Sequence, residues 1–204
     1  MAKRTAGWQL SELPELRPGD WAYIRTKTIA SFVIRFLFKS YYNHALWIAQ
    51  ILKNDQGVLQ SVGIIESVAK GVSPGDLWKL YQKADIVIMR ADCPDETAHQ
   101  ALMEAYKNGR KRYDWLIPLD IIRRYGWRNA FISLIWIIKG EKVLFPHVKD
   151  RSVVCVEAIQ EPYADVGFPL TDKDWLLSPD PYSSSVARPI FYGYGPKIKA
   201  KVKP

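Results

Sequence analysis

The alternation of apolar and polar positions predicts several short strands in the first half of the chain. A strand is expected at "WAYIRT", directly after the turn residues Pro18-Gly19-Asp20, and another at "ADIVIMR". Two further apolar runs, "NHALWIAQIL" and "GVLQSVGIIESVAKGV", are joined by "KNDQ". Together with Gly57, this connection predicts a β-hairpin whose turn is centred near residue 55.

Longer apolar patterns predict helices. The segment "TIASFVIRFLFKSYY" is expected to be a helix that is buried on most sides, and "SPGDLWKLYQ" a short helix with Pro74 near its start. The clearest helix is "DCPDETAHQALMEAYKNG", because Pro94 and acidic residues open it and Gly109 closes it. In "RSVVCVEAIQEPYADVG" apolar residues recur at helical spacing, and Pro162 is expected to kink or end that helix.

The order of these elements predicts one α+β domain in which a small antiparallel sheet or barrel packs against helices. The length of 204 residues is enough to bury a core without disulfides or metals. We place the main domain at residues 1–168, with an apolar helical insert at about 115–142 followed by a short strand at "EKVLFP". Residues 169–204, rich in Pro, Ser and Gly, are predicted to be a loop-rich, basic extension with room for one short helix.

The formal net charge of +8 favours anionic partners. The basic residues gather in "MAKR", "KNGRKRYDW" and "GPKIKAKVKP", so an anionic membrane or an acidic cell-wall surface is a possible partner, and a solubilising tail is the alternative. These residues are not interleaved with aromatic side chains on a glycine-rich platform. We therefore expect no specific binding of nucleic acid.

The apolar segments bear on location. The N-terminal sequence lacks an apolar stretch of the kind found in cleavable signals, so we expect a cytoplasmic protein or one delivered without such a signal. The most hydrophobic stretch, "NAFISLIWIIKG", has about ten apolar residues where a bilayer crossing needs about 20. It is predicted to be a buried helix or a segment lying on a membrane surface.

Cys155 is the candidate nucleophile. It stands at the start of a predicted helix, where unpaired N–H groups and the helix dipole lower the pKa of a thiol and can also hold an oxyanion. A cysteine nucleophile needs a base and a group that orients the base. His44 lies in an apolar strand, and the predicted turn places it opposite Glu66 or Ser67 across the hairpin.

Other residues of the same types are weaker candidates. Cys93 also precedes a helix, but neighbouring acidic residues oppose formation of its thiolate. His99 is expected to face water on its helix, and His147 lies in a predicted loop. Cys155 as a small buried hydrophobe, His44 as a hydrogen-bonded core residue and Glu66 as an exposed strand residue remain the plain alternatives. With two cysteines and no Cys/His cluster at ligand spacing, no metal or other cofactor is expected.

The order of the motifs resembles a known family. "PGDW", an apolar helix, "YNHALWI", "IIES" with "KGV", "DIVIMR", a helix, "RYDW" and "VVCVEAI" follow one another as in the circularly permuted, NlpC-type papain-like cysteine hydrolases of the YiiX-like group. The similarity spans roughly residues 17–168. Val156 stands where that group usually has Ser after the cysteine, and Pro162 interrupts the following helix.

The resemblance implies a fold and a function. It implies a permuted papain-like domain in which Cys155 is the nucleophile, His44 the base and Glu66 the orienting carboxylate. The implied activity is hydrolysis or acyl transfer at an amide or ester bond, since members of this superfamily cleave cell-wall peptide amides and permuted members are linked to lipid-like acyl substrates. A non-catalytic module of the same fold, which binds a wall fragment, a lipid or a protein partner, is the alternative.

Overall fold

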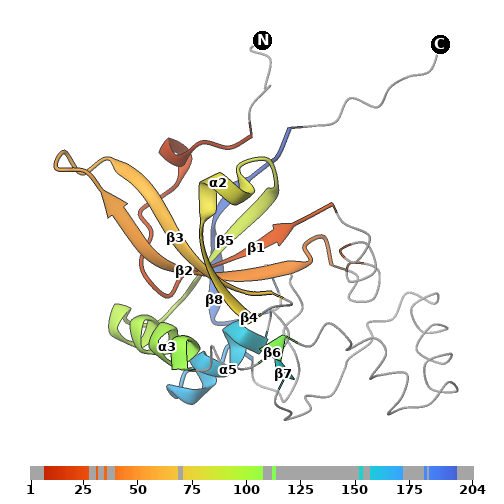
Figure 1. The fold of residues 1–204 in the computed structure, drawn as a ribbon. Coiled ribbons are helices and arrows are strands. Elements are labelled where there is room, and N and C mark those ends of the chain that lie inside the picture. The colour runs from red at the N-terminus through yellow and green to blue at the C-terminus, as the bar shows by residue number, and fades with distance from the viewer. Residues whose placement is uncertain are drawn as a thin grey trace, which may run out of the picture.

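Six antiparallel strands form one sheet in the order β4-β3-β2-β1-β5-β8 (Figure 1). The computed structural model describes residues 7–27, 31, 35, 40–68, 71–107, 112–113, 152–153, 157–171, 182 and 184–196. The elements are η1 (Leu10–Glu12), β1 (Trp21–Arg25), β2 (His44–Lys53), β3 (Leu59–Val68), β4 (Gly71–Asp76), α2 (Leu77–Tyr81), β5 (Asp85–Ala91), α3 (Asp95–Lys107), β6 (Arg112–Tyr113), β7 (Ser152–Val153), α5 (Glu157–Asp165) and β8 (Ala187–Gly193).

Both faces of this sheet are covered. Helices α3 and α5 pack on one face, whereas α2 and the N-terminal arm lie on the other (Figure 1). In β2, Trp47 belongs to the first core, and Leu46 and Ile48 belong to the second. Because successive side chains of a strand point to opposite faces, a strand covered on both sides carries an unbroken apolar run. This explains why "WAYI", "ALWI" and "IVIM" lack the alternation of a half-exposed strand.

The predicted hairpin is confirmed, but its register differs from the prediction. Glu66 pairs with Leu46, so the register is shifted by two residues from the one in which Glu66 lies opposite His44. Register shifts occur at Ile48/Gln50 and at Leu52/Lys53, which the sequence pattern did not predict. A shift of one residue moves a side chain to the other face, whereas a shift of two keeps it on the same face. His44 and Glu66 therefore remain on one side of the sheet as diagonal neighbours.

Three other predictions need correction. Pro74 lies in the edge strand β4, and the short helix α2 begins only after its N-cap, Asp76, whose side chain accepts a hydrogen bond from the N–H of Lys79 at 2.8 Å. Pro162 does not end the last helix, because α5 continues to Asp165. The prediction of a loop-rich extension is wrong for residues 187–193, which form β8 at the sheet edge beside β5.

Other expected elements are confirmed, described in part, or outside the described residues. The strands at "WAYIRT" and "ADIVIMR" are confirmed as β1 and β5, and the long helix with acidic residues in its first turn is confirmed as α3. Of the apolar helix predicted between the first two strands, Ser31 and Arg35 are described and are helical. The apolar insert at about 115–142 and the strand at "EKVLFP" lie outside the described residues.

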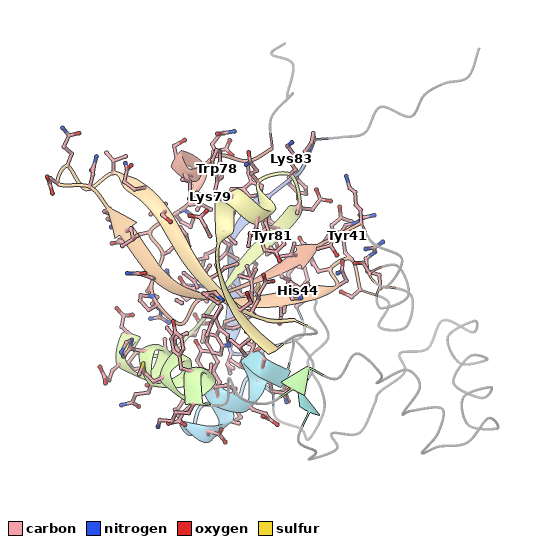
Figure 2. All side chains as sticks on the ribbon, viewed as in Figure 1. Tyr41, His44, Trp78, Lys79, Tyr81 and Lys83 are labelled. Carbon is pink, nitrogen blue, oxygen red and sulfur yellow. The ribbon has the colours of Figure 1, made fainter. Side chains whose placement is uncertain are left out.

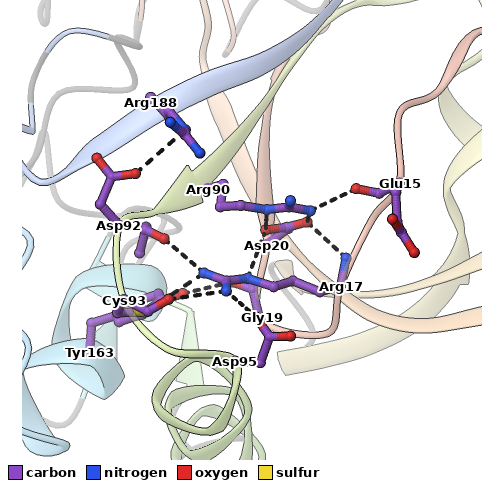
Figure 3. Close-up of polar contacts among 11 residues, drawn as sticks. Glu15, Arg17, Gly19, Asp20, Arg90, Asp92, Cys93, Asp95, Tyr163 and Arg188 are labelled. Atoms are coloured by element: carbon purple, nitrogen blue, oxygen red, sulfur yellow. Dashed lines mark hydrogen bonds and ion pairs between the residues drawn. The ribbon is translucent and has the colours of Figure 1, made fainter.

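The turn before β1 shows why its sequence is "RPGD" (Figure 3). Gly19 has φ of 98°, and a Cβ on it would lie 2.4 Å from the backbone oxygen of Ala98 in α3. The next residue, Asp20, has a fully buried carboxylate that accepts hydrogen bonds from Nε and Nη2 of Arg90 at 2.9 and 2.7 Å. The N–H of Arg17 donates to the same carboxylate at 2.9 Å. The turn thus joins β1, β5 and α3 at one point.

Candidate active site

His44, the first residue of β2, forms a close pair with Glu66 of β3. Figure 2 shows His44 below Tyr81 of α2. The Nε2 atom of His44 lies 2.5 Å from Oε2 of Glu66, and their side chains are 14% and 9% exposed. The hydroxyl of Tyr81 donates to the same oxygen at 2.6 Å. His44 and Glu66 lie on the same face of the sheet as Leu46, which is the face covered by α2. The polar groups of His44, Glu66 and Tyr81 therefore all lie on that side.

Tyr81 is a site residue that the sequence did not single out. It ends α2, whose five residues pack against β3 and β4 through Leu77 and the N-cap at Asp76. The indole N–H of Trp8 donates to the carbonyl of Tyr81 at 3.1 Å, so the N-terminal arm also holds this helix end. A tyrosine at the end of a short helix carries no sequence signal for this role, because the role depends on where α2 folds back over the sheet.

The environment keeps Glu66 ionised. Burial by itself raises the pKa of this carboxyl, but the hydrogen bonds from His44 and Tyr81 outweigh it and hold the pKa below its usual value. The pKa of Tyr81 is raised, first by burial and then by its hydrogen bond to Glu66. Tyr81 is therefore a neutral donor and Glu66 an anionic acceptor at neutral pH. A carboxylate in this position fixes the orientation of an imidazole ring and stabilises its charged form.

Asn43, directly before His44, locks the entry to β2. Its side-chain N–H groups donate to the hydroxyls of Thr26 and Ser31 at 2.8 and 3.1 Å. Its side-chain oxygen accepts from the N–H of Thr26 at 2.9 Å and from Nη1 of Arg35 at 3.1 Å. The residue is 4% exposed. All four hydrogen-bonding positions of a buried amide are thus used, which fixes the backbone from which His44 projects.

The third predicted member of the site is Cys155. It lies outside the described residues, two positions before the first residue of α5. The described part of α5 is anchored to β2, because the indole N–H of Trp47 donates to the carbonyl of Ala158 at 2.8 Å. The structure therefore brings His44 and Glu66 together, and the meeting of this pair with Cys155 stays a prediction.

The weaker candidates also have a place in the structure. His99 is exposed on α3, as predicted. Cys93 is partly buried beside Arg17, and burial raises the pKa of its thiol despite the nearby guanidinium. His147 lies outside the described residues. Within the described ranges, no three His, Cys, Asp or Glu side chains gather in a way that could hold a metal ion.

No protein-family model matches the sequence, and no curated protein matches it. Among solved structures the chain is similar to the metalloprotein yiiX from Escherichia coli O157:H7, a DUF1105 protein, with 17% sequence identity and a TM-score of 0.48. The similarity covers 76% of this chain and 69% of that chain. A likeness this weak says nothing about chemistry, so the candidate site depends on its own geometry.

None of the helices that the structure describes is long and apolar enough to cross a membrane.

Proposed function

We propose that this protein is a hydrolase or acyltransferase with a cysteine nucleophile and a permuted papain-like arrangement. Its target is an amide or ester bond of a cell-wall peptide or a lipid-like substrate. The observation that carries the proposal is the buried pair of His44 and Glu66, 2.5 Å apart, with Tyr81 bound to the same carboxylate oxygen. An imidazole oriented in this way by a carboxylate is the base that a cysteine nucleophile needs.

The proposed reaction gives His44, Cys155 and the backbone at the start of the helix each a role. The Nε2 atom of His44 faces Glu66, so Nδ1 is the nitrogen that exchanges a proton with the thiol. The Cys155 thiolate attacks the substrate carbonyl carbon, and backbone N–H groups at the start of its helix stabilise the oxyanion. His44 returns the proton to the departing amine or alcohol, leaving a thioester. Water or another acceptor then attacks the thioester and gives its proton to His44, and the thiolate is released with the acyl product.

The fold sets one condition for this chemistry. His44 lies on the α2 side of the sheet, whereas Trp47 points to the α5 side. The sulfur of Cys155 must therefore reach the imidazole around the start of β2 and not across the sheet. His44 is the first residue of that strand, and 14% of its side chain is exposed, which is compatible with an approach from the strand end.

Alkylation of the two cysteines tests the proposal. The protein is treated with iodoacetamide at pH 7, and the labelling of each cysteine is followed by mass spectrometry of its peptide. We expect Cys155 to react much faster than Cys93, whose raised thiol pKa makes it a slow internal reference. His44→Ala slows Cys155 at least tenfold, whereas the matched control His99→Ala, on the exposed face of α3, leaves it unchanged.

Two outcomes refute the proposal. If Cys155 reacts no faster than a thiol in an unfolded peptide, or if His44→Ala leaves its rate unchanged in a folded protein, the protein is a binding module and not an enzyme. Circular dichroism and a denaturation curve establish that the variant is folded.

Substrate class is tested separately. Wild type and Cys155→Ser are compared on short cell-wall peptide amides and on acyl esters of increasing chain length. The net charge of +8 supports an anionic surface as the place where substrate is met. Co-sedimentation with vesicles that contain anionic lipid, at low and high salt, measures this attraction. Release of product by Cys155→Ser at the wild-type rate contradicts the assigned nucleophile.

A further inference from the structure

A proline inside α5 leaves one backbone carbonyl without its usual partner. In an α-helix the carbonyl of Ala158 bonds to the N–H four residues later, but that residue is Pro162, which has no N–H. The indole N–H of Trp47, in β2, donates to this carbonyl instead, at 2.8 Å. Trp47 is 2% exposed and Ala158 is half-buried, so the bond is partly shielded from water. The tryptophan thus replaces the missing helical hydrogen bond with one between two elements.

The other end of α5 is also held. The hydroxyl of Tyr163 donates to the carbonyl of Gly19 at 2.9 Å, and the rings of Trp47 and Tyr163 stack with centroids 5.5 Å apart. The helix ends at Asp165, Gly167 follows with φ of 79°, and the N–H of Phe168 bonds to the carbonyl of Tyr163. A helix held at two points along its length can neither rotate nor slide against the sheet.

We propose that Trp47 is a positioning residue for the reaction, and that its indole N–H takes the place that Pro162 leaves open at the Ala158 carbonyl. The inference rests on the proposed function. Trp47 follows His44 by three residues in β2, and Ala158 follows Cys155 by three residues in the chain. The hydrogen bond therefore ties together the two segments that carry the proposed base and the proposed nucleophile, and it sets the rotation of the helix at its start.

A double-mutant cycle tests this, with two measurements on each protein. The variants are Trp47→Phe, Pro162→Ala and the combination of both. Urea denaturation gives the unfolding equilibrium, and alkylation at several pH values gives the rate constant and apparent pKa of Cys155. In Trp47→Phe the partly buried carbonyl of Ala158 loses its donor, which raises the unfolding constant roughly tenfold. We expect the alkylation rate of Cys155 to fall at least tenfold.

The combined variant separates stability from positioning. A backbone N–H at position 162 can bond to the Ala158 carbonyl, so most of the lost stability returns. The link to β2 does not return, so alkylation of Cys155 stays slow and its pH profile stays shifted. Pro162→Ala alone leaves alkylation within about twofold of wild type, because a carbonyl accepts two hydrogen bonds and Trp47 keeps its own.

Trp21→Phe is the matched control. Trp21 is fully buried in the same core, and its ring lies 5.6 Å from that of Tyr163, but its indole N–H has no hydrogen-bond partner among the described residues. This change removes a similar volume and no hydrogen bond, so we expect some loss of stability and an unchanged apparent pKa of Cys155. An equal shift of that pKa in Trp21→Phe and Trp47→Phe overturns the inference, because general loosening of the core then explains both.

Failure of the inference differs from failure of the proposed function. If the wild-type Cys155 is fast and the combined variant recovers both stability and alkylation rate, Trp47 is a purely structural residue and the enzyme proposal stands. If the wild-type Cys155 is as slow as Cys93, the proposed function fails and the positioning role fails with it, whatever the denaturation curves show.

Discussion

The hydroxyl of Tyr81 offers a direct measurement of how the fold tunes Glu66. Tyr81→Phe removes one hydrogen bond from the Oε2 atom of Glu66 and keeps the ring that packs at the end of α2. The His44 contact to the same oxygen remains. The carboxylate then keeps the cost of burial, which raises its pKa, but loses one of the two hydrogen bonds that lower it.

The size of the effect follows from the charge on the acceptor. A hydrogen bond to an ionised group contributes about 1.5–3 kcal/mol, more than one to a neutral group. We therefore expect the pKa of Glu66 to rise, because the ionised carboxylate loses more than the protonated one. The free energy of unfolding at pH 7 should fall by about 1.5–3 kcal/mol.

The pH dependence gives the sign. The folded-state pKa of Glu66 lies below its unfolded value of about 4.3, so the ionised carboxylate stabilises the fold above that pH. This stabilisation is lost as the pH falls through the lower folded-state value. The difference between wild type and Tyr81→Phe is therefore largest at neutral pH. It shrinks to about 0.5–1.5 kcal/mol, the contribution of a neutral hydrogen bond, once Glu66 is protonated in both proteins.

Urea denaturation at pH 7 and near pH 3, together with an NMR titration of the Glu66 carboxyl carbon, measures both quantities. Tyr106→Phe is the matched control, because Tyr106 is 48% exposed on α3, away from the site. A destabilisation by Tyr81→Phe that is the same at both pH values would show that the hydroxyl does not act on an ionised carboxylate. A Glu66 pKa unchanged by the substitution would contradict the reasoning outright.

Three further predictions concern the scaffold around the site. Gly19→Ala should destabilise the fold by about 2 kcal/mol or more, measured by urea denaturation, because its φ is positive and its Cβ would meet the Ala98 carbonyl; a loss below 0.5 kcal/mol would contradict this. Asp20→Asn should cost about 3 kcal/mol in the same assay, since it breaks a buried pair with Arg90, and a melting temperature equal to that of wild type would count against it. Asn43→Ala should slow the alkylation of Cys155 in the folded protein, because it frees the backbone from which His44 projects. If glycerol restores the free energy of unfolding and the alkylation rate together, the role of Asn43 is purely structural.

The sequence predicted the sheet well where strands are covered on both faces. Unbroken apolar runs such as "IVIM" located β1, β2 and β5, and Gly57 located the hairpin turn, where its φ is 77°. The edges were predicted less well. Strand β4 contains Pro74 and β8 contains Pro189, and a proline within a run argues against a strand unless the strand lies at an edge. Edge positions become known only once the whole sheet is assembled.

The pairing of His44 with Glu66 could be predicted from the sequence, but the residues around the pair could not. His44 and Glu66 could be paired because the hairpin is local in sequence, and a register error of two residues preserved the face. The contacts of Tyr81 and Trp47 were missed because their partners depend on packing between distant elements. For the same reason the sequence did not show that the helix continues past Pro162, where a tryptophan more than 100 positions away in the chain bonds to the carbonyl of Ala158.

Strand β8 has a consequence for how the chain reaches its native state. Its partner β5 ends at Ala91, which pairs with Ala187, so the two strands are separated by roughly 100 residues. A newly made chain can assemble β1 to β5 early, but one edge of that sheet stays open until the distant strand arrives. Open edges recruit other chains, and distant pairings form slowly. Aggregation during synthesis should therefore depend on how quickly residues 187–193 dock, and a peptide of that sequence supplied in trans should suppress it.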